Sequence, residues 1–208
     1  MKDINQLKKH YEKLDLDSCS TAQDEGWIFD MVLGWIKPKE ILEIGFYRGG
    51  SAFLMLSLSE ANVTSIDPIF NITDEILGRS VQDQYEIHER EFASVEKIQL
   101  EFKERFKFYQ KSSLDIRPDL EGNKFDFMFI DGDHCEVGAR NDLQLCLDLG
   151  IRYALVDDWV QPENYPKTTP TIFGEEFWDK FKVLTVFYRN ATYDNKRIPM
   201  VLLENITT

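Results

Sequence analysis

The stretch EILEIGFYRGGSAFLML, residues 40–56, runs from an apolar segment through a glycine-rich turn into a second apolar segment. Residues 40–45 favour a buried β-strand, whereas the segment after the turn has the length and pattern of a helix. Gly45, Gly49 and Gly50 lie in the turn between them. Glycine lets the backbone approach a ligand closely and present N–H groups at the start of a helix. The stretch therefore predicts a strand-turn-helix unit that can hold a ligand at the turn.

Strand-like and helix-like segments alternate on both sides of this unit. Short apolar or β-branched runs, each ending near Gly, Ser or Asp, predict strands at 40–45, 61–67, 105–113, 125–131 and 151–158. Helical patterns occupy 27–36, 51–59, 73–106, 137–149 and 174–181. Two further strands, 182–190 and 199–205, flank a polar turn and predict a closing antiparallel hairpin. We expect an α/β, Rossmann-like, mostly parallel sheet of seven strands with helices on both faces and ligands at the carboxyl ends of the strands.

Length and composition favour a single domain. Of 208 residues, 43% are hydrophobic and 13% aromatic, which suits one compact unit with a full core.

Two segments extend the predicted domain. Residues 1–19 are predicted to form an N-terminal helical extension, and residues 70–106 an enlarged crossover. Surface helices are the simpler interpretation of that crossover. The alternative is that its first half, residues 70–92, caps the substrate.

Charge and cysteine content exclude several classes of protein. The net charge of −13 argues against a nucleic-acid partner, which requires clustered Lys and Arg. Cys19, Cys135 and Cys146 cannot all pair within one chain and show no Cys-x-x-Cys spacing, so reduced thiols and a cytoplasmic location are expected. No run of 18 apolar residues and no signal-peptide pattern occurs, so neither membrane insertion nor secretion is expected.

Two carboxylates beside the glycine-rich turn indicate the kind of ligand. Glu43 precedes the turn, where it would repel a pyrophosphate but suit a ligand with an ammonium or sulfonium charge. Asp67 ends the second strand 22 residues after Gly45, the separation expected of a carboxylate that holds ribose hydroxyls. Together they point to S-adenosylmethionine. The alternative is that small residues serve only packing in this turn.

Further carboxylates end the fourth and fifth predicted strands. Asp131 follows one, and Asp157 with Asp158 follows the other. Three converging carboxylates repel one another unless a cation or protons intervene, and oxygen ligands favour Mg²⁺, Mn²⁺ or Ca²⁺. The simpler interpretation is that strand-end aspartates cap helices. Asp133 is interpreted as such a cap, or as a group that supports the metal ligands, rather than as a ligand itself.

Four segments, taken in order and spacing, resemble the class I S-adenosylmethionine-dependent methyltransferases: LEIGFYRGGSA (42–52), SIDP (65–68), FIDGDH (129–134) and LVDDW (155–159). More narrowly, residues 20–205 resemble the metal-dependent O-methyltransferases, which include the catechol, caffeoyl-coenzyme A and macrocin-type sugar enzymes. The acidic pair at 157–158 is the form associated with the macrocin-type enzymes.

The resemblance implies roles for individual residues. The methionine part of the cofactor would be lined by the loop residues Glu43, Gly45, Tyr47, Gly49 and Ser51. Asp67 would bind the ribose, Ser113 would contact the adenine, and Asp131 would face the cofactor as well as the metal. The metal ligands would be Asp131, Asp157 and Asp158. His134 stands where catechol-type members carry a lysine base, and its ordinary pKa of about 6.5 suits proton abstraction near neutral pH; Asp131 is the alternative base.

These expectations describe a magnesium-dependent O-methyltransferase that acts on a hydroxyl of a small molecule, such as a sugar or natural product. Two alternatives stay open. One is a methyltransferase without a metal, in which His134 and the acidic residues hold an amine or hydroxyl substrate directly. The other is a non-catalytic ligand-binding protein on the same fold. A homo-oligomer is compatible with either.

Overall fold

A computed structural model of the chain describes residues 4–14, 16, 25–68, 81–133, 136–157, 177, 179–190 and 197–208. The helices are α1 (Ile4–Lys13), α3 (Gly26–Ile36), α4 (Gly50–Leu58), α5 (Val81–Phe102), the short 3₁₀ helix η2 (Lys103–Arg105), α6 (Arg117–Leu120) and α7 (Glu136–Asp148). The strands are β1 (Glu40–Ile44), β2 (Asn62–Ile66), β3 (Phe106–Tyr109), β4 (Phe127–Ile130), β5 (Tyr153–Val156), β6 (Phe181–Asn190) and β7 (Arg197–Asn205).

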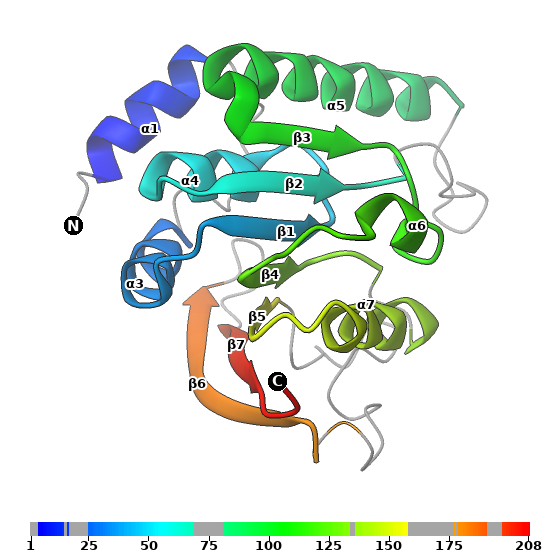
Figure 1. Ribbon diagram of the computed structural model, residues 1–208. Coiled ribbons are helices and arrows are strands. Elements are labelled where there is room, and N and C mark those ends of the chain that lie inside the picture. Colours follow the sequence, from blue (N-terminus) through cyan, green and yellow to red (C-terminus); the bar gives the residue numbers. More distant parts are fainter. Residues whose placement is uncertain are drawn as a thin grey trace.

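The seven strands form one sheet in the order β3-β2-β1-β4-β5-β7-β6 (Figure 1). Strands β1 to β5 are parallel to their neighbours, whereas β7 is antiparallel to both β5 and β6. The predicted Rossmann-like sheet with a closing hairpin is therefore confirmed. Strand order reverses between β1 and β4, and ligands of open α/β sheets bind at such a reversal, outside the carboxyl ends of the strands.

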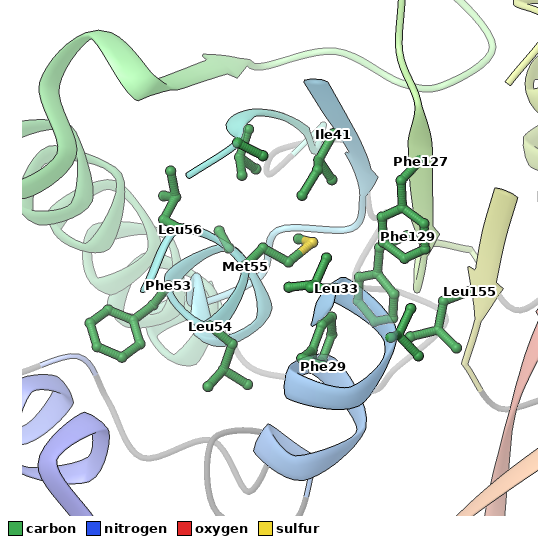
Figure 2. Close-up of a cluster of buried hydrophobic side chains, with 14 of the residues drawn as sticks. Phe29, Leu33, Ile41, Phe53, Leu54, Met55, Leu56, Phe127, Phe129 and Leu155 are labelled. Carbon is green, nitrogen blue, oxygen red and sulfur yellow. The ribbon is translucent and has the colours of Figure 1, made fainter. Parts of the chain in front are cut away.

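The side chains of the central strands alternate between two cores, one on each face of the sheet. Ile41, Phe129 and Leu155 face the first core, which they share with α3 and α4 (Figure 2). There the rings of Phe29 and Phe129 meet edge to face, with centroids 5.1 Å apart. Residues one position along each strand face the second core, which includes side chains of α6 and α7. Full burial of each such Leu, Ile or Phe contributes about 2–3 kcal/mol, so helices on both faces hold the sheet in place.

Helix α4, which follows the glycine-rich turn, is buried on every side. Gly50 is buried, and Ser51 to Leu56 are all at most 6% exposed. A helix that is apolar all round is expected in the interior. Helix α1 packs on it, with the rings of His10 and Tyr11 edge to face with Phe53. The start of α4 is therefore held rigidly against the sheet.

Several boundaries differ from the sequence prediction. Strand β3 ends at Tyr109 rather than at 113, because Lys111 N–H bonds back to the Tyr109 carbonyl and the chain turns; Ser113 therefore does not end the strand. Helix α6, with Pro118 in its first turn, was not predicted. The predicted helix 174–181 extends too far, since Phe181 begins β6.

Other predictions fall wholly or partly outside the described residues. Residues 73–80 of the predicted crossover helix lie there, and α5 covers its later part, so the cap over the substrate stays a prediction. Cys19 and Cys135 also lie there, whereas Cys146 is a free, buried thiol. Within the described part of the chain, no helix has both the length and the apolar character needed to cross a bilayer.

Candidate active site

The residues that follow four neighbouring strands lie side by side at one edge of the sheet. The N–H groups of Gly45, Asp131 and Asp157 each donate a hydrogen bond of 2.9 Å to the last residue of the adjacent strand, and Asp67 does the same at 3.2 Å. These bonds extend the parallel ladder one step beyond each strand. The arrowheads of β1, β2 and β3 accordingly end together in Figure 1. The predicted shared edge of polar strand ends is present.

Gly45 makes a close approach to the end of β4. Its φ is +91°, and a Cβ atom built on it would lie 2.0 Å from the carbonyl oxygen of Asp131. No other residue type fits there without moving the backbone. Gly49 also has a left-handed φ, of +75°, but its Cβ would meet side chains rather than backbone, 2.5 Å from Ile98 Cδ1 and 2.7 Å from the Phe46 ring. Both glycines thus meet packing requirements of the fold, whatever the loop binds.

Asp67, the candidate ribose ligand, also shapes the glycine-rich loop. Its Oδ2 accepts hydrogen bonds of 2.9 Å from the backbone N–H groups of Phe46 and Tyr47. Tyr47 has the left-handed φ of +47°, which is uncommon for a side chain other than glycine. Its ring is exposed and lies under the Arg48 guanidinium, 5.0 Å from the ring centroid. The end of β2 therefore holds the loop that follows β1.

Glu43 is fully buried behind the same loop. Its Oε1 accepts a hydrogen bond from the Ser51 hydroxyl at the start of α4, and its Oε2 accepts one from Ser65 of β2. Burial raises the pKa of Glu43 to about 7; the two serine hydroxyls lower it, and the nearby Asp67 raises it further. This carboxyl ties β1, β2 and α4 together and has no surface exposed to solvent.

We expect Glu43→Gln to change how stability depends on pH. Because the pKa of Glu43 is 4.5 in a model peptide and about 7 here, the folded chain retains a proton between these values that the unfolded chain releases. The contribution of Glu43 to the free energy of unfolding is therefore fully present below pH 4.5, the pKa of the unfolded chain. It is lost as the pH rises through the folded-state pKa of about 7, by about 3 kcal/mol at most. The free energy of unfolding of Glu43→Gln, relative to that of wild type, should therefore rise by up to this amount between about pH 5 and about pH 8.

Urea unfolding at the two pH values measures this difference. Glu40→Gln is the matched control, since Glu40 lies at the partly exposed start of the same strand. It should show no comparable change with pH. A difference between Glu43→Gln and wild type that stays constant with pH would contradict the raised pKa.

Asp131 and Asp157 supply two of the three predicted metal ligands. Asp157 is 4% exposed and follows β5, whereas Asp131 is partly exposed and follows β4. Adjacent parallel strands lie about 4.8 Å apart, so the two backbones are close enough for both residues to serve one cation. Asp158 and the candidate base His134 lie outside the described residues. Among those that the structure describes, no three His, Cys, Asp or Glu residues form a metal-binding group.

Ser113, the predicted adenine contact, lies in the turn after β3 beside helix α7. Its hydroxyl accepts a hydrogen bond of 3.1 Å from the Asn141 side-chain amide. The neighbouring Asp142 is 1% exposed and was not identified from the sequence. The sequence feature that could have revealed it is helical spacing: Asp142 lies on the same face of α7 as Ala139 and Cys146, which are buried in the core. A carboxylate on that face indicates a role beyond solubility.

A hollow of about 400 Å³ lies at the opposite end of the sheet, near the starts of β1 and β2. Arg105 lines it but donates its hydrogen bonds to the carbonyls of Leu56, Ser59 and Ala61, so it serves the fold. Ligands of parallel sheets bind at the other end of the strands. We therefore place the candidate site at the carboxyl ends.

A family model described as "Methyltransferase domain" matches residues 42–155, more than half of the 208-residue chain. The chain belongs to this family. The match includes the glycine-rich loop, Asp67 and Asp131, and it ends two residues before Asp157. It confirms the class I methyltransferase that the four sequence segments indicated. No curated protein matches the chain significantly.

Solved methyltransferases share the fold along the whole chain. The O-methyltransferase from Bacillus cereus, solved with S-adenosylhomocysteine, is 16% identical over 99% of this chain and 92% of its own, with a TM-score of 0.60. Podospora anserina PaMTH1, also bound to S-adenosylhomocysteine, is 18% identical over 99% and 88%, with a TM-score of 0.61. TomG from Streptomyces achromogenes, an O-methyltransferase solved with S-adenosylmethionine, is 16% identical over 99% and 91%, with a TM-score of 0.60. At these identities the likeness is one of fold.

Proposed function

We propose that this methyltransferase transfers the methyl group of S-adenosylmethionine to a hydroxyl oxygen of a small molecule, with a divalent cation bound beside the acceptor. The observation that supports it best is the shared edge at which Gly45, Asp67, Asp131 and Asp157 follow four neighbouring strands. A glycine-rich loop and carboxylates from three strands meet there. The proposal is also supported by the family match, by the S-adenosylmethionine of TomG and by the S-adenosylhomocysteine of the other two neighbours.

The cofactor is proposed to lie across the carboxyl ends of β1 and β2. Ser51 and the loop residues Gly45, Tyr47 and Gly49 would surround its methionine part, with the Glu43 carboxyl fixing Ser51 from behind. The ribose would lie at Asp67, whose Oδ2 already orders the loop. The adenine would lie toward Ser113, and Asp131 would face the reacting end.

The proposed cation is held by Asp131, Asp157 and Asp158. Two of these carboxylates lie at neighbouring strand ends, where Asp157 is almost fully buried, and their mutual repulsion favours a bound cation. A divalent cation would supply positive charge that favours the deprotonated acceptor and orients it. Mg²⁺, Mn²⁺ or Ca²⁺ suits such oxygen ligands.

Methyl transfer then requires geometry and a deprotonated oxygen. The acceptor oxygen attacks the methyl carbon, the carbon–sulfur bond breaks, and its electron pair stays on sulfur in S-adenosylhomocysteine. The hydroxyl proton passes to a base, for which we propose His134, with Asp131 as the alternative. The protein's part is to hold donor and acceptor in line.

The proposal is tested by incubating the purified chain with S-adenosylmethionine and a panel of catechols, simple sugars and glycosylated natural products. Formation of S-adenosylhomocysteine and of the methylated acceptor is followed by mass spectrometry, with Mg²⁺ or with EDTA. Product that depends on Mg²⁺ is the expected result. Product that persists in EDTA would support the alternative of a methyltransferase without a metal. Cofactor binding without product would favour the non-catalytic alternative. The panel excludes polynucleotides because of the net charge of −13.

A further inference from the structure

The turn that follows β4 is enclosed by close contacts on three consecutive residues. The carbonyl oxygen of Asp131 lies where a side chain of Gly45 would be, 2.0 Å from its built Cβ. A Cβ on Gly132 would lie 2.8 Å from Ile44 Cγ2 and 3.1 Å from Asp142 Oδ2. The turn thus packs against the end of β1 on one side and against α7 on the other.

The third residue of the turn contacts α7 one turn before Asp142. A Cβ on Gly138 would lie 2.5 Å from Asp133 Cβ and 2.6 Å from its Cγ. The glycine therefore permits the Asp133 side chain to lie directly on the helix backbone. Two contacts, Asp133 on Gly138 and Gly132 on Asp142, join residues 131–133 to the same helix.

Asp142 is the buried polar group of this arrangement. It is 1% exposed, and neither of its carboxylate oxygens accepts a well-formed hydrogen bond within the described part of the chain. The side chains of Ser113 and Asn141 nevertheless lie close enough to lower its pKa. Burial, the largest influence, and the charge of Asp133 raise that pKa to about 7. Burying a carboxyl with incomplete hydrogen bonding is unfavourable by about 1–3 kcal/mol, so a hydrophobic side chain would serve stability better.

We infer that Asp142 is a positioning residue for the adenosine end of the cofactor site, holding the 131–133 turn against the Ser113 segment. The inference rests on the proposed function, since it concerns the ligand of that site. From one helix, Asp142 reaches Gly132, while its neighbour Asn141 bonds Ser113. Ser113 and Asp131 are the residues proposed to contact adenine and to face the reacting end. Asp142 thereby sets their separation without touching the ligand.

Two probes distinguish the adenosine end of the proposed site from its methionine end. S-adenosylhomocysteine carries both the adenosine and the amino-acid part, whereas methylthioadenosine carries only the first. Calorimetry should show that Asp142→Leu weakens binding of both probes by the same factor. We expect about tenfold or more, by analogy with the loss seen when groups that orient metal ligands are removed. Asp142→Asn, which keeps the shape and polarity, should restore most of the affinity that Asp142→Leu loses. Val137→Ala, at an exposed position on the same helix, should change neither.

Amide hydrogen exchange provides a readout that needs no ligand. In Asp142→Leu the amides of residues 131–133 should exchange at least tenfold faster, while those of β1 and β2 stay protected. If Asp142→Leu does not fold, Asp142→Ser takes its place, because a serine is too short to reach Gly132. A wild-type chain that binds neither probe would refute the proposed cofactor site but leave the exchange test of Asp142 valid.

Three results would overturn the inference. One is unchanged exchange at 131–133 in a folded Asp142→Leu or Asp142→Ser chain. Another is weaker binding of S-adenosylhomocysteine with unchanged binding of methylthioadenosine, which would assign the effect to the methionine end. The last is an equal loss of affinity in Asp142→Asn and Asp142→Leu, which would mean that charge rather than packing is responsible.

Discussion

Gly45→Ala is expected to lower the free energy of unfolding by about 2–6 kcal/mol and to abolish cofactor binding. Two costs add at this position. Forcing a left-handed φ on a residue with a side chain costs about 1–3 kcal/mol, and overpacking costs a similar amount. The second arises because the new Cβ would lie 2.0 Å from the Asp131 carbonyl oxygen. Relief of that clash must move either the loop or the end of β4, and both line the proposed site.

Two other glycines provide matched controls for the same substitution. Gly122 has φ of +83° but no atom within 4 Å of its built Cβ, so Gly122→Ala tests backbone strain alone and should cost about 1–3 kcal/mol. Gly34 lies exposed within α3 with an open Cβ direction, and Gly34→Ala should stabilise the chain by about 0.5–1 kcal/mol. Urea unfolding and calorimetry with S-adenosylhomocysteine measure all three variants. A loss at Gly45 no greater than that at Gly122 would refute the steric argument.

Asp157→Ala is expected to abolish metal-dependent methyl transfer while cofactor binding changes little. Its carboxylate lies at the end of β5, beside Asp131 and away from the glycine-rich loop of β1. Loss of groups that only orient metal ligands costs about 10–100-fold, so loss of a direct ligand should exceed about a hundredfold. The rate of S-adenosylhomocysteine formation at saturating Mg²⁺ measures the first effect, and calorimetry measures the second.

The matched variants distinguish loss of the ligand from loss of shape. Asp157→Asn keeps the volume but not the negative charge, and we expect it to lose Mg²⁺-dependent turnover as well. Asp179→Ala removes an exposed aspartate that precedes β6 and should leave turnover unchanged. Full activity of Asp157→Ala would contradict the proposed metal dependence. Wild-type activity that is insensitive to EDTA would contradict it as well.

The strands were well predicted because a parallel strand between two helix layers is a short, almost continuous apolar run. FDFMFID contains β4, and IRYALVDD contains β5. The carboxylates that end these runs were found for the same reason, since the change from apolar to charged marks the end of the sheet. Helix α6 escaped prediction because its four residues, RPDL, are too few to show a period.

Glu43 and Asp142 show where a sequence pattern stops being informative. Glu43 was correctly placed at the turn, but a single sequence does not reveal that Ser51 and Ser65 both donate hydrogen bonds to it. Asp142 was not identified, although its spacing from Ala139 and Cys146 placed it on the apolar face of α7. Its burial depends on Gly132 and Ser113, which come from two other segments of the chain.

The amino-acid sequence by itself determined the alternation of strands and helices, the glycine-rich turn and the family, because these depend on residues close together in the chain. Only the tertiary structure decided which polar side chains are buried and what surrounds them. Burial brings together groups from distant segments, and it is burial that raises the pKa values of Glu43 and Asp142 to about 7.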